Sequence, residues 1–318
     1  MRTQLPFALL AAAFACSLAT TPANARARVF VASYGSDSNP CTFGSPCKTF
    51  QHAHDVVDAG GEVTAIDSAG FGPINITKAV TITSPDGVEA GIVPPVNGTA
   101  ITINAGPTDE VQLRGLTIDG SGTAANGIVL NSGAGITVTN CVVQNFVPGS
   151  GNGILLQPTS GLSFIITNTL LSRNGAYGLY YHPTSGTPAA YGVIDHVIAT
   201  DNNSGIGIDS SLATGGSTTV AISNSVASNN PGNGIYANTV NSLVLRVSID
   251  GSKISGNGHG IDAEDSSQVF LGSSTITGNT VGVYNNAVPG LMSSWLNNQI
   301  AGNGQDGFGA QFLARALR

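Results

Sequence analysis

Tyrosines, acids and amides recur at one place in a repeated phrase of this chain. Counting outward from each repeated Gly-plus-apolar pair, one solvent-facing column holds Val129, Leu155, Tyr180, Gly207, Tyr236, Asp262 and Tyr284. Two residues further on, a second column holds Asn131, Gln157, His182, Asp209, Asn238, Glu264 and Asn286. Aromatic rings beside amides and carboxylates suit sugars, which offer an apolar face for stacking and hydroxyls for hydrogen bonding. The candidate substrate-binding residues are therefore Tyr180, His182, Tyr236, Tyr284 and Asn238.

Three acids in these columns are candidate catalytic residues: Asp262, Glu264 and Asp209. Asp262 and Glu264 would be neighbours on one face, roughly 6.5 to 7 Å apart from strand rise alone. That separation lies at the short edge of the range for the two carboxylates of an inverting glycosidase. Exposed strands also carry Tyr, Asp and Asn for solubility, so ordinary solvated surface remains the alternative. The pattern predicts no metal site and no cofactor.

The elements that must position these residues follow from the repeat. Its Gly-plus-apolar pairs begin at Gly127, Gly153, Gly178, Gly205, Gly234, Gly260, Gly282 and Gly307, with separations of 26, 25, 27, 29, 26, 22 and 25 residues. A period of this length, with no intervening helical pattern, is typical of solenoids. We therefore predict an all-β fold, a single-stranded right-handed parallel β-helix over residues 62–307.

The second half of each repeat is a nine-residue phrase. Its copies include Ile166–Asn174, Ile194–Asn202, Ile222–Asn230, Ile249–Asn257, Leu271–Asn279 and Trp295–Asn303. The first and sixth positions are mostly aliphatic and should point inward. Asn is frequent at the third and ninth positions, which we predict to be corners, because Asn tolerates the left-handed backbone. Cys141 occupies the fourth position and should be a buried packing residue rather than a nucleophile.

Both ends of the rod need covers, since open sheet edges invite aggregation. Residues 26–61 form the predicted N-terminal cap, with a strand at Val29–Ser33 and a capping helix at Lys48–Ala59. We expect His52, His54, Asp55 and Asp58 on the polar side of this helix, where the spacing of the two histidines does not suit a metal site. Residues 308–318, with Phe308 and Phe312, form the predicted C-terminal cap.

The first 25 residues are typical of a secretory signal peptide. They combine Arg2, an apolar stretch from Phe7 to Ala19 and a small-x-small site at Ala23-Asn24-Ala25. Cleavage after Ala25 predicts a secreted or periplasmic protein. In an oxidising compartment the neighbouring Cys41 and Cys47 should form a disulfide, which leaves Cys141 free.

The net negative charge of the chain limits the classes of molecule that it is expected to bind. Without Arg2 the chain has 10 basic and 18 acidic residues, a net charge of about −8. This balance disfavours nucleic acid and anionic membranes, because phosphate binding needs a positive surface. It also disfavours a polyanionic substrate unless a cation intervenes. No later segment is apolar for long enough to predict a membrane span.

The segment VFVASYGSDSNPCTFGSPCKTFQHAHDVVDAGGEV resembles the entry segment of secreted β-helix proteins of the pectate-lyase-like superfamily. This resemblance implies the fold and export. Polygalacturonase-like members use clustered aspartates, a Gly-His-Gly and a later Arg-Ile-Lys. Here Gly258-His259-Gly260 is present without the other motifs, so we expect His259 to be a loop residue.

The lyase and epimerase patterns are also incomplete. Pectate-lyase-like members need a calcium cage of carboxylates and an Arg or Lys base, and the basic residues of the coils, Arg173, Arg246 and Lys253, have no such set of acids in register. The epimerase-like Asp-Pro-His-Asp is missing. Our hypothesis is an exported β-helix that associates with polysaccharide; an enzyme of this kind would be a polysaccharide lyase or glycoside hydrolase. The alternative is a non-catalytic surface, matrix or adhesin-like scaffold.

Overall fold

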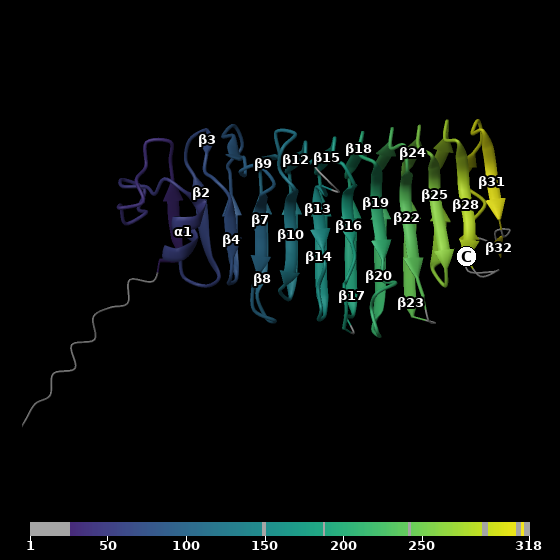
Figure 1. Ribbon diagram of the computed structural model, residues 1–318, viewed down its shortest axis with the longest axis horizontal. Helices are drawn as coiled ribbons and strands as arrows, with labels where there is room; N and C mark the ends of the chain where they lie inside the picture. Colours follow the sequence, from purple (N-terminus) through teal and green to yellow (C-terminus); the bar gives the residue numbers. More distant parts are fainter. Residues whose placement is uncertain are drawn as a thin grey trace, which may run out of the picture.

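The protein is a rod built from parallel strands, as seen in a computed structural model (Figure 1). The structure describes residues 26–147, 151–186, 188–240, 243–287, 292–309 and 313–314. The predicted signal peptide, residues 1–25, lies outside the described residues. Within them, no helix is long and apolar enough to cross a membrane.

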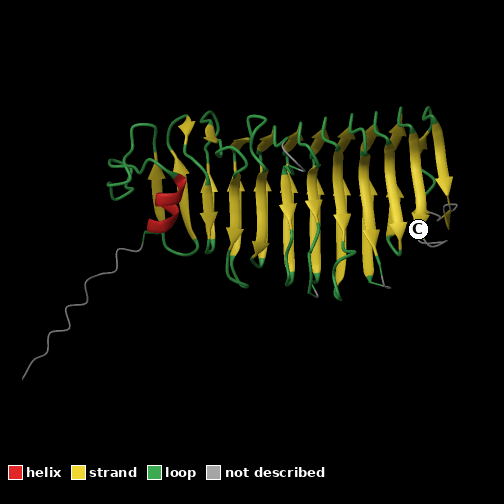
Figure 2. Ribbon diagram, viewed as in Figure 1, coloured by secondary structure: helices red, strands yellow, loops and turns green. Residues whose placement is uncertain are grey.

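Three parallel sheets run along the rod, and each coil of the chain adds one strand to each (Figure 2). The twelve-stranded sheet contains β1 (Arg28–Val31), β2 (Gly61–Ala65), β5 (Val80–Thr83), β8 (Glu110–Arg114), β11 (Gly135–Thr139), β14 (Leu162–Thr167), β17 (Ala190–Asp195), β20 (Ser217–Ser223), β23 (Val244–Asp250), β26 (Gln268–Gly272), β29 (Met292–Ser294) and β32 (Leu313–Ala314). The predicted parallel β-helix is confirmed.

The sheet with the candidate residues, called here the tyrosine sheet, contains β4 (Ile74–Ile76), β7 (Thr99–Asn104), β10 (Asn126–Ser132), β13 (Ile154–Leu156), β16 (Tyr177–Tyr181), β19 (Ser204–Asp209), β22 (Asn233–Thr239), β25 (His259–Asp265), β28 (Val281–Ala287) and β31 (Gln305–Gly309). The short-strand sheet contains β3 (Ala69–Gly70), β6 (Ala90–Ile92), β9 (Leu116–Asp119), β12 (Val142–Gln144), β15 (Leu170–Ser172), β18 (Ile198–Thr200), β21 (Val226–Ser228), β24 (Lys253–Ser255), β27 (Thr275–Thr277) and β30 (Gln299–Ile300).

The core is a stack of aliphatic side chains, as the repeat predicted. Ile166, Ile194, Ile222, Ile249 and Leu271 are each at most 1% exposed. They lie in register, one above another, on β14, β17, β20, β23 and β26. Cys141 belongs to the same interior and is a free, buried cysteine. Burial raises the pKa of its thiol to about 11, so it stays protonated at neutral pH.

The repeated glycines are needed for close packing between coils. A Cβ on Gly127 would lie 2.3 Å from the carbonyl oxygen of Gly153, and one on Gly205 would lie 2.4 Å from that of Gly234. Backbone cannot give way as a flexible side chain can, so any larger residue would push neighbouring coils apart. The glycines therefore recur with the period of the coils because each of these coils packs closely against the backbone of the next at this position.

The corner prediction is right for one Asn column and wrong for the other. At the third position, Asn140, Asn168 and Asn224 have the expected left-handed backbone, with φ of 55°, 48° and 48°, whereas in the last copy the left-handed residue is Leu296, just before Asn297. At the ninth position the left-handed residue is the one before the Asn, as in Asn229, whose φ is 56°. The ninth-position Asn side chains instead turn into the core.

Those inward side chains form what we call the asparagine ladder: Asn174, Asn202, Asn230, Asn257, Asn279 and Asn303. In each step an amide oxygen accepts hydrogen bonds from the backbone and the side chain of the preceding ladder residue. Asn257 Oδ1, for example, accepts from Asn230 N at 3.0 Å and Asn230 Nδ2 at 2.9 Å. The ladder thereby satisfies backbone groups that the tight corner would leave unpaired.

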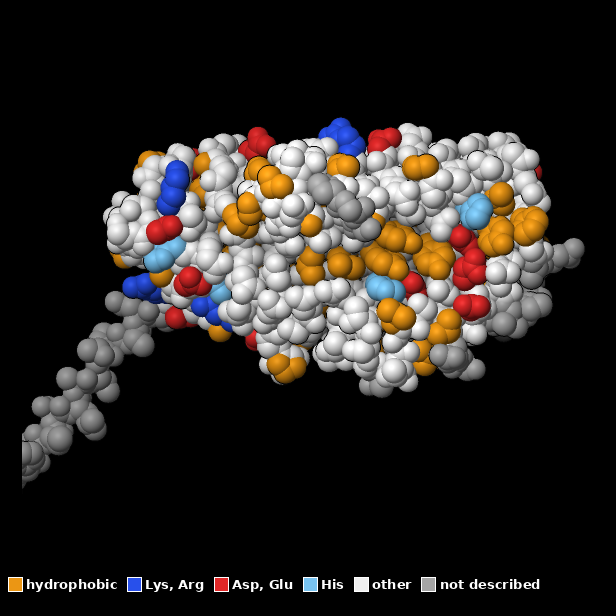
Figure 3. Space-filling view, in the orientation of Figure 1, with side chains coloured by type: hydrophobic (Ala, Val, Ile, Leu, Met, Phe, Trp, Pro, Cys, Tyr) orange, Lys and Arg blue, Asp and Glu red, His pale blue; other side chains and the backbone are white. Residues whose placement is uncertain are grey.

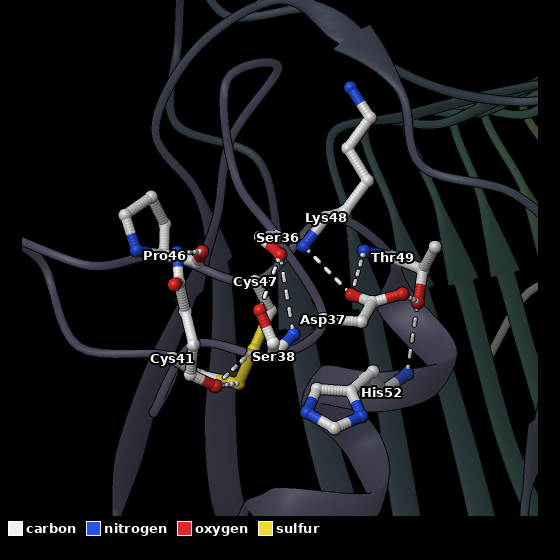
Figure 4. Close-up of a disulfide and its surroundings, with 10 residues drawn as sticks. Ser36, Asp37, Ser38, Cys41, Pro46, Cys47, Lys48, Thr49 and His52 are labelled. Atoms are coloured by element: carbon white, nitrogen blue, oxygen red, sulfur yellow. Dashed lines mark hydrogen bonds between the residues drawn. A yellow bond between two sulfur atoms is a disulfide. The ribbon is translucent and has the colours of Figure 1, made fainter.

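The helix of the N-terminal cap is shorter than predicted. Helix α1 covers Phe50–Val56, with Thr49 as N-cap accepting a hydrogen bond from His52 N. Beside it, Cys41 and Cys47 form the predicted disulfide, with their Cα atoms 4.6 Å apart (Figure 4). Asp37 fastens the loop to the helix by accepting hydrogen bonds from the backbone nitrogens of Lys48 and Thr49. His52 lies close to both sulfurs, but the sulfurs are bonded to each other and offer no thiolate to a metal.

At the other end, the predicted C-terminal cap is partly outside the described residues, which omit 310–312 and 315–318. Within it, β32 adds a strand to the twelve-stranded sheet. Phe308 lies on β31, pairs with Tyr284 and is 51% exposed. Phe308 therefore extends the column of outward side chains on the tyrosine sheet.

His54 was expected on the polar side of the helix and is instead buried, at 2% exposure. Its Nε2 accepts a hydrogen bond from Thr77 N at 3.2 Å, while Nδ1 lies 3.1 Å from Asp55 Oδ1. The apolar spacing of the helix could not reveal this, because the partner is a backbone group on the next coil. Burial, opposed in part by Asp55, lowers the pKa of His54.

This burial predicts a pH dependence of stability. Because the pKa of His54 is lower in the folded state than in the unfolded chain, the unfolded state binds its proton first as pH falls below about 6.5. Stability should therefore drop between pH 7 and pH 5 in the wild type and drop less in His54→Gln, as measured by the thermal unfolding midpoint. His52→Gln is the matched control. Parallel pH profiles for wild type and His54→Gln would contradict the prediction.

Candidate functional site

The two predicted columns are in register on the tyrosine sheet. Along the first, Tyr180 pairs with Gly207, Gly207 with Tyr236, Tyr236 with Asp262, and Asp262 with Tyr284. Along the second, Asp209, Asn238, Glu264 and Asn286 follow one another on successive strands. The structure thus brings the predicted binding and catalytic residues together on β16, β19, β22, β25 and β28, with His182 directly after β16.

Tyr180 lies in a stack of rings on β16. Its ring centroid is 4.1 Å from that of Tyr177 and 4.7 Å from that of His182, with interplanar angles of 7° and 9°. Gly207 on the next strand makes room for this stack, because a Cβ there would lie 2.6 Å from Cε1 of Tyr177 and 2.8 Å from Cδ2 of Tyr180. Tyr180 therefore has a ring neighbour in both Tyr177 and His182.

Asp209 on β19 is tied to this stack and is 5% exposed. The hydroxyl of Tyr180 donates a hydrogen bond to Asp209 Oδ2 at 3.0 Å, and the backbone N–H of Ser211 donates one to Asp209 Oδ1 at 2.9 Å. His182 Nδ1 lies 3.3 Å from Asp209 Oδ2. Burial alone would raise the pKa of Asp209, but the contacts with His182, Ser211 and Tyr180 outweigh it and lower the pKa. Asp209 is therefore an ionised, firmly held carboxylate.

Tyr236 on β22 occupies the middle of the site. It is half-buried, and its ring stacks on none of the aromatic rings described by the structure. Burial, followed by the charges of Asp209 and Asp262, raises the pKa of its hydroxyl. Tyr236 therefore combines a neutral hydroxyl with a ring that has no aromatic neighbour, the combination that a sugar-stacking residue needs.

Asp262 is on β25, where it pairs with Tyr236 of the neighbouring strand β22, and it is 6% exposed. Its Oδ2 is 3.2 Å from Nδ1 of His259, whereas its buried Oδ1 has no hydrogen-bond partner among the described residues. Burial and the nearby charge of Glu264 raise the pKa of Asp262, although His259 opposes them. The expectation that His259 is a loop residue is wrong, because it is the first residue of β25 and faces the site.

Asn238 and Glu264 form the second row. The side-chain oxygen of Asn238 is buried without a hydrogen-bond partner in the described chain. Glu264 accepts a hydrogen bond from Asn286 Nδ2 at 2.8 Å and is only partly buried. Two acceptors, Asn238 Oδ1 and Asp262 Oδ1, thus stand unpaired on neighbouring strands beside the ring of Tyr236.

Tyr284 ends the site on β28. Its ring lies parallel to His259, at a centroid distance of 4.7 Å, and to Phe308, at 5.2 Å. The repeat pattern placed Tyr284 correctly but missed Tyr177 and His259, which precede the Gly-plus-apolar pair and belong to a third outward column. The signal for this column was present, since Tyr177 and His259 occupy the same position of two repeats.

A second surface feature lies on the twelve-stranded sheet, away from the candidate residues. It is a shallow hollow of about 420 Å³ lined by Arg28, Glu62, Thr81, Thr83, Gln112, Leu113, Arg114, Thr137 and Thr139. Arg28 already pairs with Glu62 at 2.8 Å. The hollow presents exposed basic and hydroxyl groups, without the buried unpaired acceptors found on the tyrosine sheet.

The fold agrees with comparisons to known proteins. A family model described as the right handed beta helix region matches residues 126–287. The chain belongs to this family, which confirms the predicted hand of the helix. The matched residues include β10 to β28 of the tyrosine sheet. No curated protein matches the sequence.

Two solved structures are similar to the chain. Pectate lyase Pel9A aligns with a TM-score of 0.53 at 16% identity, covering 88% of this chain and 73% of that one. The A-module of the mannuronan C-5 epimerase AlgE4 of Azotobacter vinelandii aligns with a TM-score of 0.49 at 15% identity, covering 81% and 90%. At such identities the likeness is one of fold, so activity must be argued from the side chains.

Proposed function

We propose that this chain is an exported β-helix protein that binds polysaccharide on the tyrosine sheet. The observation that supports this best is the surroundings of Tyr236: among the described residues its ring stacks on no other aromatic ring, and it lies beside two acceptors without a donor. A sugar can supply the missing groups: its apolar face stacks on the ring, and its hydroxyls donate to Asn238 Oδ1 and Asp262 Oδ1 once these buried oxygens turn toward it. The disulfide of the cap suits an oxidising compartment.

The site also contains carboxylates suited to acid–base chemistry. The raised pKa of Asp262 favours the protonated form that a proton donor needs, whereas the lowered pKa of Asp209 keeps it ionised, as a nucleophile or a charge-stabilising group must be. Environments that separate two carboxyl pKa values in this way are typical of paired acid and base residues. Glu264 is the third candidate. Hydrolysis or elimination by these residues is our proposal for any catalysis at this face.

The test is a glycan panel presented to the chain from Arg26 onward, with reducing-sugar and unsaturated-product assays on each glycan that binds. Tyr236→Ala should weaken binding about tenfold, because it removes the stacking surface. Tyr191→Ala is the matched control, because Tyr191 is a 64% exposed tyrosine of the twelve-stranded sheet. Glu264→Gln retains shape and hydrogen bonding but cannot exchange a proton.

Equal losses in Tyr236→Ala and Tyr191→Ala would show that the glycan binds elsewhere. Failure of the wild type to bind any glycan on the panel would favour the non-catalytic scaffold. Unchanged unfolding midpoints in both variants are required, so that lost binding is not confused with lost structure.

A further inference from the structure

The tyrosine sheet has a one-sided charge distribution. Its described strands contain no Lys or Arg, whereas Asp209, Asp262, Glu264, Asp265 and Asp306 all belong to them. Figure 3 shows this face, with a band of hydrophobic atoms flanked by histidines and acids, and with basic side chains confined to the N-terminal end and one edge. An anionic ligand here would meet negative charge without a compensating cation from the protein.

A bound metal ion would not readily reverse this charge. Asp209, Asp262 and Glu264 do not bring three ligand atoms close enough together for a shared ion. Among the described residues, the one group that satisfies this geometry is Cys41, Cys47 and His52 in the cap. Hard cations such as Ca²⁺ need several oxygen ligands converging on one point. A carboxylate-bearing sugar therefore has no built cation bridge on this face.

The unpaired acceptor atoms of this face favour a ligand that carries hydrogen-bond donors. Asp262 is more than nine-tenths buried, and its free Oδ1 is an acceptor, as is Oδ1 of Asn238. A buried acceptor without a donor is unfavourable, so a ligand that donates hydrogen bonds is favoured at both atoms. Sugar hydroxyls donate, whereas a uronate carboxylate at this place would only accept.

The direction of the ligand follows from the sheet. Asp209, Tyr236 and Asp262 lie on three consecutive strands, β19, β22 and β25, which are about 4.8 Å apart. A chain that touches all three must run across the strands, along the axis of the rod. An extended polysaccharide has about this advance for each sugar, so one sugar can meet each coil.

We propose that the tyrosine sheet selects polysaccharides without carboxylate groups and binds them along the rod axis, across β19, β22 and β25. This inference rests on the proposed glycan binding and specifies its substrate class. Repulsion by Asp209, Asp262 and Glu264 rejects polyuronates, while the unpaired acceptors bind neutral, hydroxyl-rich chains. The face thereby differs in its ligand from what the name of the similar pectate lyase states for that protein.

Isothermal titration calorimetry tests this with hexasaccharides of β-1,4-linked glucose, mannose and xylose against hexamers of galacturonate and mannuronate. At low salt, at least one neutral hexamer should bind about tenfold more tightly than either uronate hexamer, because like charges repel most strongly when unscreened. Equal or tighter uronate binding that is lost in Tyr236→Ala would overturn the inference while leaving glycan binding intact. Restoration of uronate binding by added Ca²⁺ at this face would overturn it as well.

Charge removal gives the second arm. At a pH where both carboxyl groups are ionised, the double variant Asp262→Asn with Glu264→Gln should bind uronates several-fold more tightly than the wild type, because it removes two negative charges and keeps the shape of both side chains. Asp250→Asn, on the twelve-stranded sheet, removes one charge elsewhere and should change nothing. No gain of uronate binding in the double variant would contradict the repulsion argument.

The hollow on the twelve-stranded sheet, which Arg114 lines, provides a further control. Uronate binding that is abolished by Arg114→Gln and unaffected by Tyr236→Ala belongs to the hollow and leaves the selectivity of the tyrosine sheet in place. If the protein binds neither neutral nor uronate hexamers, both the proposed function and this inference fall. Uronate binding lost in Tyr236→Ala contradicts the selectivity, uronate binding lost in Arg114→Gln belongs to the hollow, and absence of all binding contradicts the proposed function itself.

Discussion

Asn230→Ala is expected to destabilise the protein by roughly 2 to 4 kcal/mol, because it breaks the asparagine ladder in its middle. Asn230 is fully buried. Its Oδ1 accepts from Asn202 N at 3.0 Å, and its Nδ2 donates to Ala199 O at 3.2 Å and to Asn257 Oδ1 at 2.9 Å. After truncation the backbone N–H of Asn202 is left buried without this acceptor, and water cannot readily replace it.

The measurement is the free energy of unfolding in urea or the thermal midpoint. Asn131→Ala is the matched control, since Asn131 also makes two side-chain hydrogen bonds, to Asn104 and from Gln157, but on the partly exposed surface. Water can satisfy those partners, so the cost should stay below about 1 kcal/mol. Similar losses in the two variants would mean that burial of the ladder contributes nothing.

Ile222→Ala is expected to cost roughly 2 to 5 kcal/mol, because it removes buried methylene and methyl groups and leaves a cavity. Ile222 is 1% exposed and lies between Ile194 and Ile249 in the central stack. Neighbouring coils are joined by backbone hydrogen bonds above and below this side chain, so the core cannot close easily around the space.

Two outward substitutions serve as controls. Val193→Ala affects a 43% exposed side chain on the adjacent strand β17, and Asn286→Ala affects an exposed amide on β28. Both should cost well under 1 kcal/mol. If either control matched Ile222→Ala, the assignment of inward and outward faces would be off by one residue, because a single-residue shift exchanges the faces of a strand.

The periodic part of the structure was predictable because one coil repeats the same physical constraint many times. The aliphatic columns, the outward columns and the Gly-plus-apolar starts all follow from strand alternation and from coil stacking. The disulfide was also predictable, since Cys41 and Cys47 are close in sequence and the chain carries a signal-like start. These features need no knowledge of contacts between distant residues.

The features that sequence reasoning missed depend on such contacts. Ninth-position asparagines resemble corner residues, and their inward rotation is evident only when successive coils exchange hydrogen bonds. His54 looks like a polar helix residue until Thr77 is placed against it. The stacking of Tyr180 with Tyr177 and His182 is likewise not evident from the repeat. The alternation of inward and outward residues along a strand predicts which way a side chain points. It does not predict which side chains of other coils lie beside it.

The asparagine ladder has a consequence for how such rods change in length. Every rung offers donors to the following coil and an acceptor to the preceding one, so the lower side of any coil is complementary to the upper side of any other. Insertion or removal of a whole coil between two ladder asparagines leaves each joint chemically identical. The number of coils can therefore vary by duplication and deletion of whole units, while a change by part of a unit would interrupt the ladder and both adjoining sheets.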